Sequence, residues 1–113
     1  MGFIYGAIAI FGMTAIAGMY LLTLVLRNKA MPKAVTLTHG FFAVLAVVLL
    51  VIYCLGNKAG PWESIIIFLL AALAGVILNF RDLMGKKTPK WFAVLHGLVA
   101  VVGFTLLLLF AFG

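Results

Sequence analysis

Residues 34–55 have the sequence AVTLTHGFFAVLAVVLLVIYCL, which contains no Asp, Glu, Lys or Arg. A helix that crosses a membrane needs about 20 mostly apolar residues, and this stretch supplies them. Three further stretches without charged residues span 2–26, 64–80 and 91–113. Because backbone groups in lipid must find their hydrogen bonds within one segment, each stretch is predicted to be a helix.

The composition leads to the same fold class. Of the 113 residues, 67% are hydrophobic and 9% are charged. A soluble domain of this size buries only about 60–70% of the surface of its chain, so it could not hide this much apolar surface. We therefore expect an all-α, antiparallel four-helix membrane bundle, with 1–113 as one transmembrane domain. Residues 2–26 are expected to be retained, because they lack the basic start of a signal peptide and are too long for one.

The net charge of +6 is concentrated in two of the three connections. In a chain with four spans, the first and third connections lie on the same side. The positive-inside rule then places both in the cytoplasm of a bacterial inner membrane, with both termini outside. The expected partner of these residues is the lipid bilayer and not nucleic acid. The basic residues are Arg27, Lys29 and Lys33 in the first connection and Arg81, Lys86, Lys87 and Lys90 in the third.

The chain aligns on itself without a gap when it is shifted by 57 residues. This pattern predicts two tandem helical hairpins, 1–56 and 57–113. Each hairpin has an even number of spans, so both have the same orientation and are related by a pseudo-twofold axis along the membrane normal. Short connections favour sequential antiparallel neighbours, which makes the second and fourth helices diagonal. The most specific matches are Pro32-Lys33 with Pro89-Lys90, His39-Gly40 with His96-Gly97, and Ala17-Gly18 with Ala74-Gly75.

The two histidines occupy equivalent places in this alignment. His39 and His96 each lie six residues after the Lys of a Pro-Lys pair, or roughly 9 Å into the helix at about 1.5 Å per residue. The face of each histidine continues into small residues, which mark helix contacts in lipid. We expect both side chains to face the bundle interior, where ionisable groups usually have a function or a partner. The small residues include Ala43, Ala46, Ala100 and Gly103.

Two imidazoles at one depth on diagonal helices suit the axial ligands of a haem. Glycines, which have no side chain, leave room beside a flat ring, and basic groups at the cytoplasmic side suit its propionates. The sequence therefore predicts one haem b per chain, ligated by His39 and His96 near the cytoplasmic face. The residues expected around it are Gly40, Gly97, Gly18, Gly75, Lys33 and Lys90.

Inward histidines on alternate helices of a four-helix membrane bundle resemble those of the small membrane b-type cytochromes. This resemblance implies electron transfer with a quinol or a partner protein. Di-haem members carry four ligand histidines, two near each membrane face, whereas this chain has two histidines in all. The residues Met-Gly-Lys-Lys-Thr-Pro-Lys-Trp at 84–91, followed by Leu-His-Gly at 95–97, also resemble four-span bacterial inner-membrane proteins, which implies no activity.

Two other functions remain open from the sequence. In a cofactor-free structural or accessory subunit, neutral histidines would bond to backbone carbonyls or to Thr side chains, with Thr36 as the nearest candidate. In a channel or transporter they would move protons, although four short helices enclose little space. Two histidines alone make a poor zinc site, no set of catalytic residues is present, and small residues on the first helix leave a homo-oligomer open.

Overall fold

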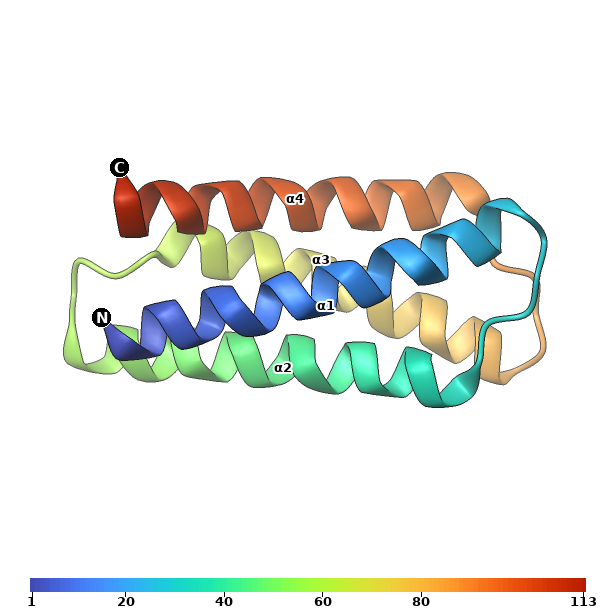
Figure 1. The fold of residues 1–113 in the computed structure, drawn as a ribbon, viewed down its shortest axis with the longest axis horizontal. Coiled ribbons are helices and arrows are strands. Elements are labelled where there is room, and N and C mark those ends of the chain that lie inside the picture. The colour runs from blue at the N-terminus through green and yellow to red at the C-terminus, as the bar shows by residue number, and fades with distance from the viewer.

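The computed structural model describes residues 1–113 and consists of four helices without a strand. The helices run antiparallel along a bundle 42 Å long (Figure 1). Each helix is long and apolar enough to cross a membrane. The all-α four-helix fold with four candidate spans is therefore confirmed. The helices are α1 (Gly2–Leu26), α2 (Lys33–Gly56), α3 (Trp62–Leu83) and α4 (Lys90–Phe112).

The largest difference from the predicted ranges is in α3, which extends beyond 64–80 at both ends. A window without charges cannot include Glu63 in its first turn or Arg81 in its last. Both charges suit the helix dipole, because an acid is favourable at a helix N-terminus and a base at a C-terminus. The other three predicted ranges agree with the structure to within one residue at each end.

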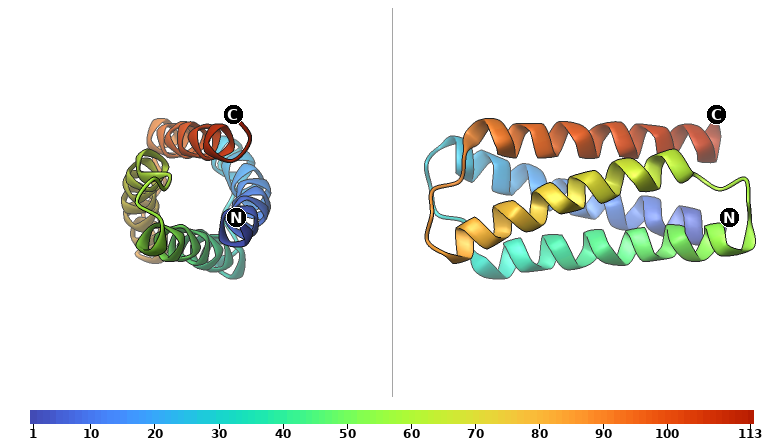
Figure 2. Two further views of the ribbon diagram at one scale, coloured as in Figure 1. Left: turned by 90° about the vertical axis from the view of Figure 1, so that its left-hand side faces the viewer. Right: turned by 180° about the vertical axis from the view of Figure 1, so that it is seen from behind.

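The helices form a closed ring in which sequential helices are neighbours and α4 returns to α1. The end-on view in Figure 2 shows α1 opposite α3 and α2 opposite α4. Packing is most extensive within the two hairpins, α1 with α2 and α3 with α4. Both termini lie at the end of the bundle that also holds the α2–α3 connection, and the two basic connections lie at the other end (Figures 1 and 2). We call these the terminal end and the basic end.

Both basic connections leave their helices through the same turn. Asn28 after α1 and Gly85 after α3 have left-handed backbones, with φ of 57° and 74°. Asparagine and glycine are the residues that adopt this conformation most readily. In each turn the next residue donates its N–H back to the helix, which is the Schellman ending. These bonds are Lys29 to the Leu24 carbonyl (2.8 Å) and Lys86 to the Arg81 carbonyl (2.9 Å).

The apolar core occupies the terminal half of the bundle. At its centre the rings of Phe11 on α1 and Phe68 on α3 stack across the diagonal, with centroids 3.9 Å apart and planes at 11°. Gly103 on α4 leaves room for this stack, because a Cβ there would lie 3.1 Å from the Phe68 ring. The core cluster is Ile4, Ala7, Phe11, Ala46, Leu50, Cys54, Ile65, Phe68 and Leu107.

Burial recurs at the same interval as the sequence matches. Only 18 of the 113 residues are buried, and 14 of these form seven pairs separated by 57 residues. Corresponding positions of the two hairpins therefore face the inside of the bundle. The pairs are Ile4 and Pro61, Ala7 and Ser64, Phe11 and Phe68, Thr14 and Ala71, Thr36 and Ala93, Ala46 and Gly103, and Leu50 and Leu107.

This pattern predicts matched losses of stability from the two hairpins. Leu50→Ala and Leu107→Ala each remove a fully buried side chain, and each should lower the free energy of unfolding by about 2–4 kcal/mol. Unfolding in mixed micelles of mild detergent and dodecyl sulfate, followed by circular dichroism, measures the loss. Leu55→Ala and Leu109→Ala are the controls on the same helices, because these side chains are 80% and 60% exposed. Equal losses in the buried and exposed variants would contradict the described core.

Candidate functional site: the histidine pair

The two histidines face each other across the diagonal between α2 and α4. Their ring centroids are 6.3 Å apart and the ring planes are at 77°. Both side chains are partly buried, and the histidines come from helices that make no close backbone contact with each other. The predicted approach of His39 and His96 is therefore present in the structure.

Each imidazole rests against a glycine of the preceding helix in its own hairpin. A Cβ on Gly18 would lie 2.9 Å from Cε1 of His39, and a Cβ on Gly75 would lie 3.1 Å from Cε1 of His96. A residue with a side chain at these positions would displace the ring. The glycines were expected to leave space for a haem, but the structure fills the space beside each of them with the imidazole of its own hairpin.

Gly18 also leaves uncovered the main-chain carbonyl that forms a hydrogen bond with His39. A helical side chain covers the turn that precedes it, so a glycine leaves the carbonyl four residues earlier uncovered. Nδ1 of His39 lies 2.9 Å from that carbonyl, which belongs to Thr14. Because a carbonyl can only accept, Nδ1 carries the proton and Nε2 of the neutral ring carries the lone pair. Histidines that ligate metals are commonly held in this way, through the other ring nitrogen.

His96 has the same surroundings but a poorer contact. The carbonyl of Ala71, four residues before Gly75, occupies the position that the Thr14 carbonyl has relative to Gly18. Nδ1 of His96 does not reach hydrogen-bond geometry and is buried without a partner. The site therefore contains one imidazole that is fixed by a hydrogen bond and one that is held by packing alone.

Thr36, the nearest candidate partner in the cofactor-free alternative, makes no hydrogen bond with His39. The Thr36 hydroxyl donates to the carbonyl of Lys33 on its own helix, at 2.9 Å. The acceptor for His39 is a main-chain carbonyl of α1, which is the other kind of partner that the sequence left open. A main-chain acceptor does not depend on the identity of the side chain, so the hydroxyl group of Thr14 is not needed for this contact.

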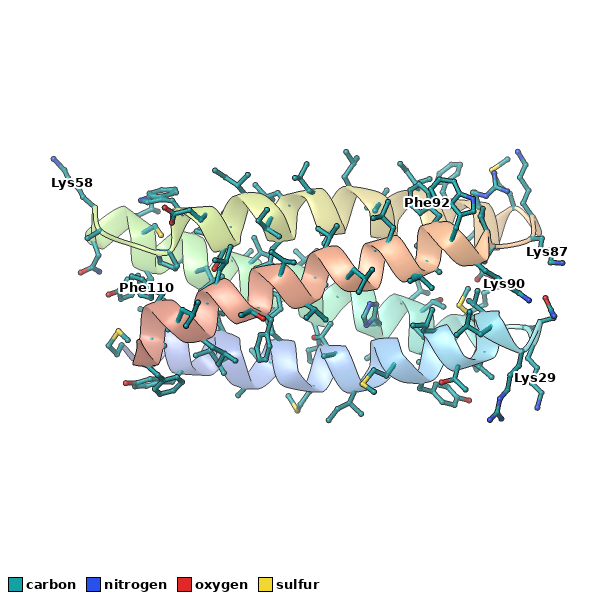
Figure 3. All side chains as sticks on the ribbon, turned by 90° about the horizontal axis from the view of Figure 1, so that it is seen from above. Lys29, Lys58, Lys87, Lys90, Phe92 and Phe110 are labelled. Carbon is teal, nitrogen blue, oxygen red and sulfur yellow. The ribbon has the colours of Figure 1, made fainter.

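The remaining predicted residues lie away from the imidazoles. A Cβ on Gly40 or Gly97 would meet no atom within 4 Å, so open space lies beside both glycines. Lys33 pairs with Asp82 at 2.6 Å and links α2 to α3. Lys90 extends from the basic end, where Figure 3 also labels Lys29 and Lys87. The structure thus joins His39, His96, Gly18 and Gly75 in one site and leaves the other predicted residues outside it.

The interior differs on the two sides of the histidine pair. Towards the terminal end lies the apolar core with its stacked Phe11 and Phe68. Towards the basic end, Oδ1 of Asn79 and Nε of Arg81 are buried without partners. Sequence reasoning gave Asn79 no role, although its position four residues after Gly75 places it on the histidine-facing side of α3. The imidazoles therefore stand between the apolar core and a region where these polar atoms lie among buried apolar side chains such as Leu21 and Val25.

Comparisons of the chain with known protein families, with curated proteins and with solved structures find no match. The class that the structure defines is a four-helix bundle with four candidate membrane spans and one inward pair of histidines.

The contacts of the glycines give a test of the site. Gly18→Ala and Gly75→Ala should each destabilise the protein by about 1–3 kcal/mol, because the new methyl group overpacks against an imidazole. Gly40→Ala and Gly97→Ala are matched controls one residue after each histidine. They should be neutral or stabilise by up to about 1 kcal/mol, since alanine favours a helix over glycine.

A double-mutant cycle attributes the effect to the ring. In a His39→Ala background the cost of Gly18→Ala should largely disappear, because the clashing atoms are gone. Unfolding in mixed micelles measures all four combinations. An unchanged cost of Gly18→Ala without the imidazole would show that the assigned contact is not its cause.

Proposed function

We propose that this chain is a membrane b-type haem protein that binds one haem between His39 and His96. The observation that carries the proposal is the distance of 6.3 Å between the two ring centroids. An imidazole nitrogen binds a first-row transition metal at about 2 Å, so two opposite ligands place their ring centroids about 6 Å apart. The observed separation fits one metal centre between the rings.

The donor set favours a haem over a bare metal ion. The structure contains no group of three or more His, Cys, Asp or Glu side chains that could hold an ion, whereas a haem needs only two axial ligands from the protein. Nδ1 of His39 bonds to the Thr14 carbonyl, so its Nε2 is available as a ligand. When bound, the haem would take up and release one electron, with a quinol or a partner protein as the other reactant.

The partners of the propionates are part of the same proposal. Lys33 already pairs with Asp82, so it is less suited to this role than the sequence suggested. Nε of Arg81 is buried without a partner and can donate to a carboxylate. Lys90 extends outward from the basic end, so Arg81 is the proposed contact.

We further propose that the bundle is a duplicated hairpin, 1–56 and 57–113, with a pseudo-twofold axis along the membrane normal. The seven buried pairs at the 57-residue interval support it, as do the matching turns at Asn28 and Gly85. The axis would pass between Phe11 and Phe68 and between His39 and His96, since each of these residues meets its own counterpart. The excess of Lys and Arg in the basic connections supports a bacterial inner membrane with the basic end in the cytoplasm.

An absorption spectrum of the protein purified in mild detergent tests the haem proposal. The reduced protein, as isolated or after addition of haemin, should show six-coordinate, low-spin haem b. His39→Ala and His96→Ala should each remove one axial ligand and convert the spectrum to a five-coordinate form or lose the haem. Thr38→Ala, an exposed change beside His39, is the control that should keep the spectrum. Protein that is colourless and takes up no haemin would overturn the proposal.

A cofactor-free structural role is the second candidate, because the His39–Thr14 hydrogen bond and the two imidazole–glycine contacts already join the helices of each hairpin. In this case His39→Ala should destabilise haem-free protein more than His96→Ala does. Only His39 loses a hydrogen bond, and such a bond contributes about 1 kcal/mol. Unfolding of both variants in mixed micelles measures the difference. A larger loss in His96→Ala would exclude the hydrogen bond as the reason for the histidine.

A further inference from the structure

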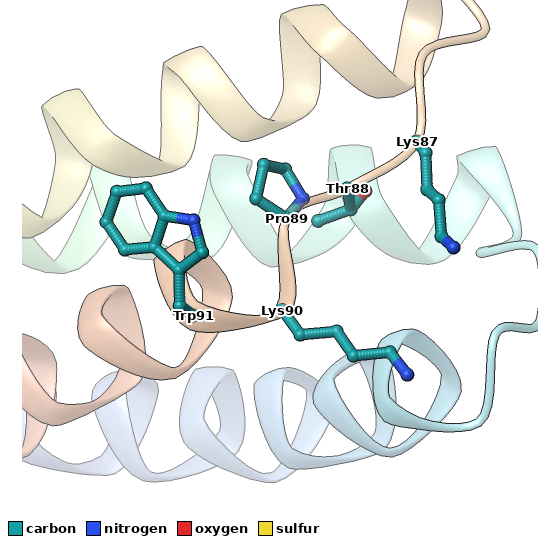
Figure 4. Close-up of a pocket in the computed structure, with 5 residues that line it drawn as sticks. All are labelled: Lys87, Thr88, Pro89, Lys90 and Trp91. Atoms are coloured by element: carbon teal, nitrogen blue, oxygen red, sulfur yellow. The ribbon is translucent and has the colours of Figure 1, made fainter.

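A shallow, open hollow at the basic end lies where the α3–α4 connection enters α4. Five consecutive residues line it: Lys87, Thr88, Pro89, Lys90 and Trp91. Figure 4 shows the side chains of Lys87 and Lys90 extending to one side of Pro89, with the Trp91 ring on the other. Trp91 is 68% exposed. The hollow thus combines two ammonium groups with a large exposed aromatic ring.

The first hairpin lacks most of the residues that line this hollow. Of the five positions 57 residues earlier, only Pro32 and Lys33 are kept, and Lys33 already bonds to Asp82. Ala30 and Ala34 stand where the second hairpin has Lys87 and Trp91. Where most buried positions of the two hairpins correspond, these exposed positions differ. The first hairpin packs without a lysine and a tryptophan at these positions, so packing of the bundle does not require Lys87 and Trp91.

The charges around the hollow are not neutralised within the chain. Asp82 is the only acid at the basic end, and its partner is Lys33 in the only salt bridge of the structure. Arg81 lies beneath the connection and donates from Nη2 to the Lys87 carbonyl at 3.1 Å, which fixes the first residue of the hollow. Lys87 and Lys90 thus extend to the same side of Pro89, and neither has a carboxylate partner. An anion is the missing counterpart.

The start of α4 adds donors at the same place. Its first helical turn closes with the N–H of Ala93 on the Pro89 carbonyl, and no side chain caps the helix. The N–H groups of Trp91 and Phe92 therefore lack acceptors. Free N–H groups and the helix dipole favour a phosphate, so they reinforce the preference that the two lysines establish.

From these observations we infer that the hollow binds the phosphate headgroup of an anionic phospholipid. The residues lie at the end of a helix that is long enough to span a membrane, at the level where headgroups lie and where tryptophan is enriched. Lys87 and Lys90 contact the phosphate, and the Trp91 ring lies at the boundary with the acyl chains. The exposed ring distinguishes a lipid from a soluble phosphate, which would leave it in water. The inference does not depend on haem binding.

Tryptophan quenching by brominated lipids in reconstituted vesicles tests the site. Trp62→Phe leaves Trp91 as the only reporter, and Trp91→Phe leaves Trp62 at the terminal end. Brominated phosphatidylglycerol should quench Trp91 with at least about fivefold higher relative affinity than brominated phosphatidylcholine, since each basic residue near an anionic surface contributes about that factor. Trp62 should show a much smaller preference.

Charge-matched variants in the Trp62→Phe background separate the hollow from the general charge of the loops. Lys87→Gln with Lys90→Gln should reduce the preference at Trp91 to near unity. Arg27→Gln with Lys29→Gln removes the same charge from the first connection and should leave most of the preference. Helical circular dichroism and the elution volume confirm that the variants fold.

Three results would overturn the inference. One is equal quenching of Trp91 by the two brominated lipids. Another is a preference that the two changes in the first connection remove as completely as those at Lys87 and Lys90. The third is relief of the quenching by millimolar inorganic phosphate at constant ionic strength, which would identify a soluble phosphate as the ligand.

Discussion

Helices in lipid gain little from hiding apolar side chains from one another, because the acyl chains are equally apolar, so they are held together by close packing and by internal polar contacts. The bundle has only 18 buried residues among 113, and its association depends on a few places where shapes match closely. Glycine creates three of them. Gly103 receives the Phe68 ring, and Gly18 and Gly75 each receive an imidazole. The remaining surface can vary widely as long as it stays apolar.

These contacts fill the two diagonals of the ring at different levels. The Phe11–Phe68 stack joins α1 to α3 within the terminal half, and His39 and His96 meet between α2 and α4 nearer the basic end. Each level therefore has one large aromatic pair on one diagonal and small residues on the helices beside it. Because the large pairs alternate between the two diagonals, side chains fill the centre of the bundle at both levels.

The spans and the depth of the histidines could be predicted from the sequence, because both follow from position along one helix. Charge-free windows located the helices, and the 57-residue interval placed His39 and His96 at one level. The contacts of the imidazoles could not be predicted, because they depend on the rotation of α1 relative to α2. Spacing along α2 pointed to Thr36, whereas the acceptor is the Thr14 carbonyl of α1, which Gly18 uncovers. The predicted range of α3 was too short because a charge-free window ends at the first charged residue, whereas the helix continues through Glu63 and Arg81.

The position of the imidazoles along the bundle has an electrical consequence. His39 lies six residues into α2, or roughly 9 Å from the basic end, which is about a third of the thickness of a bilayer core. A charge that reaches this level from the basic end crosses only that fraction of the transmembrane potential, or roughly 0.8 kcal/mol per 100 mV. The part of the bundle between the histidine pair and the terminal end is longer, so the larger part of the transmembrane potential falls across it. Exchange of charge between the histidine pair and the basic end would therefore respond to membrane energisation about a third as strongly as transfer of a charge across the whole bilayer.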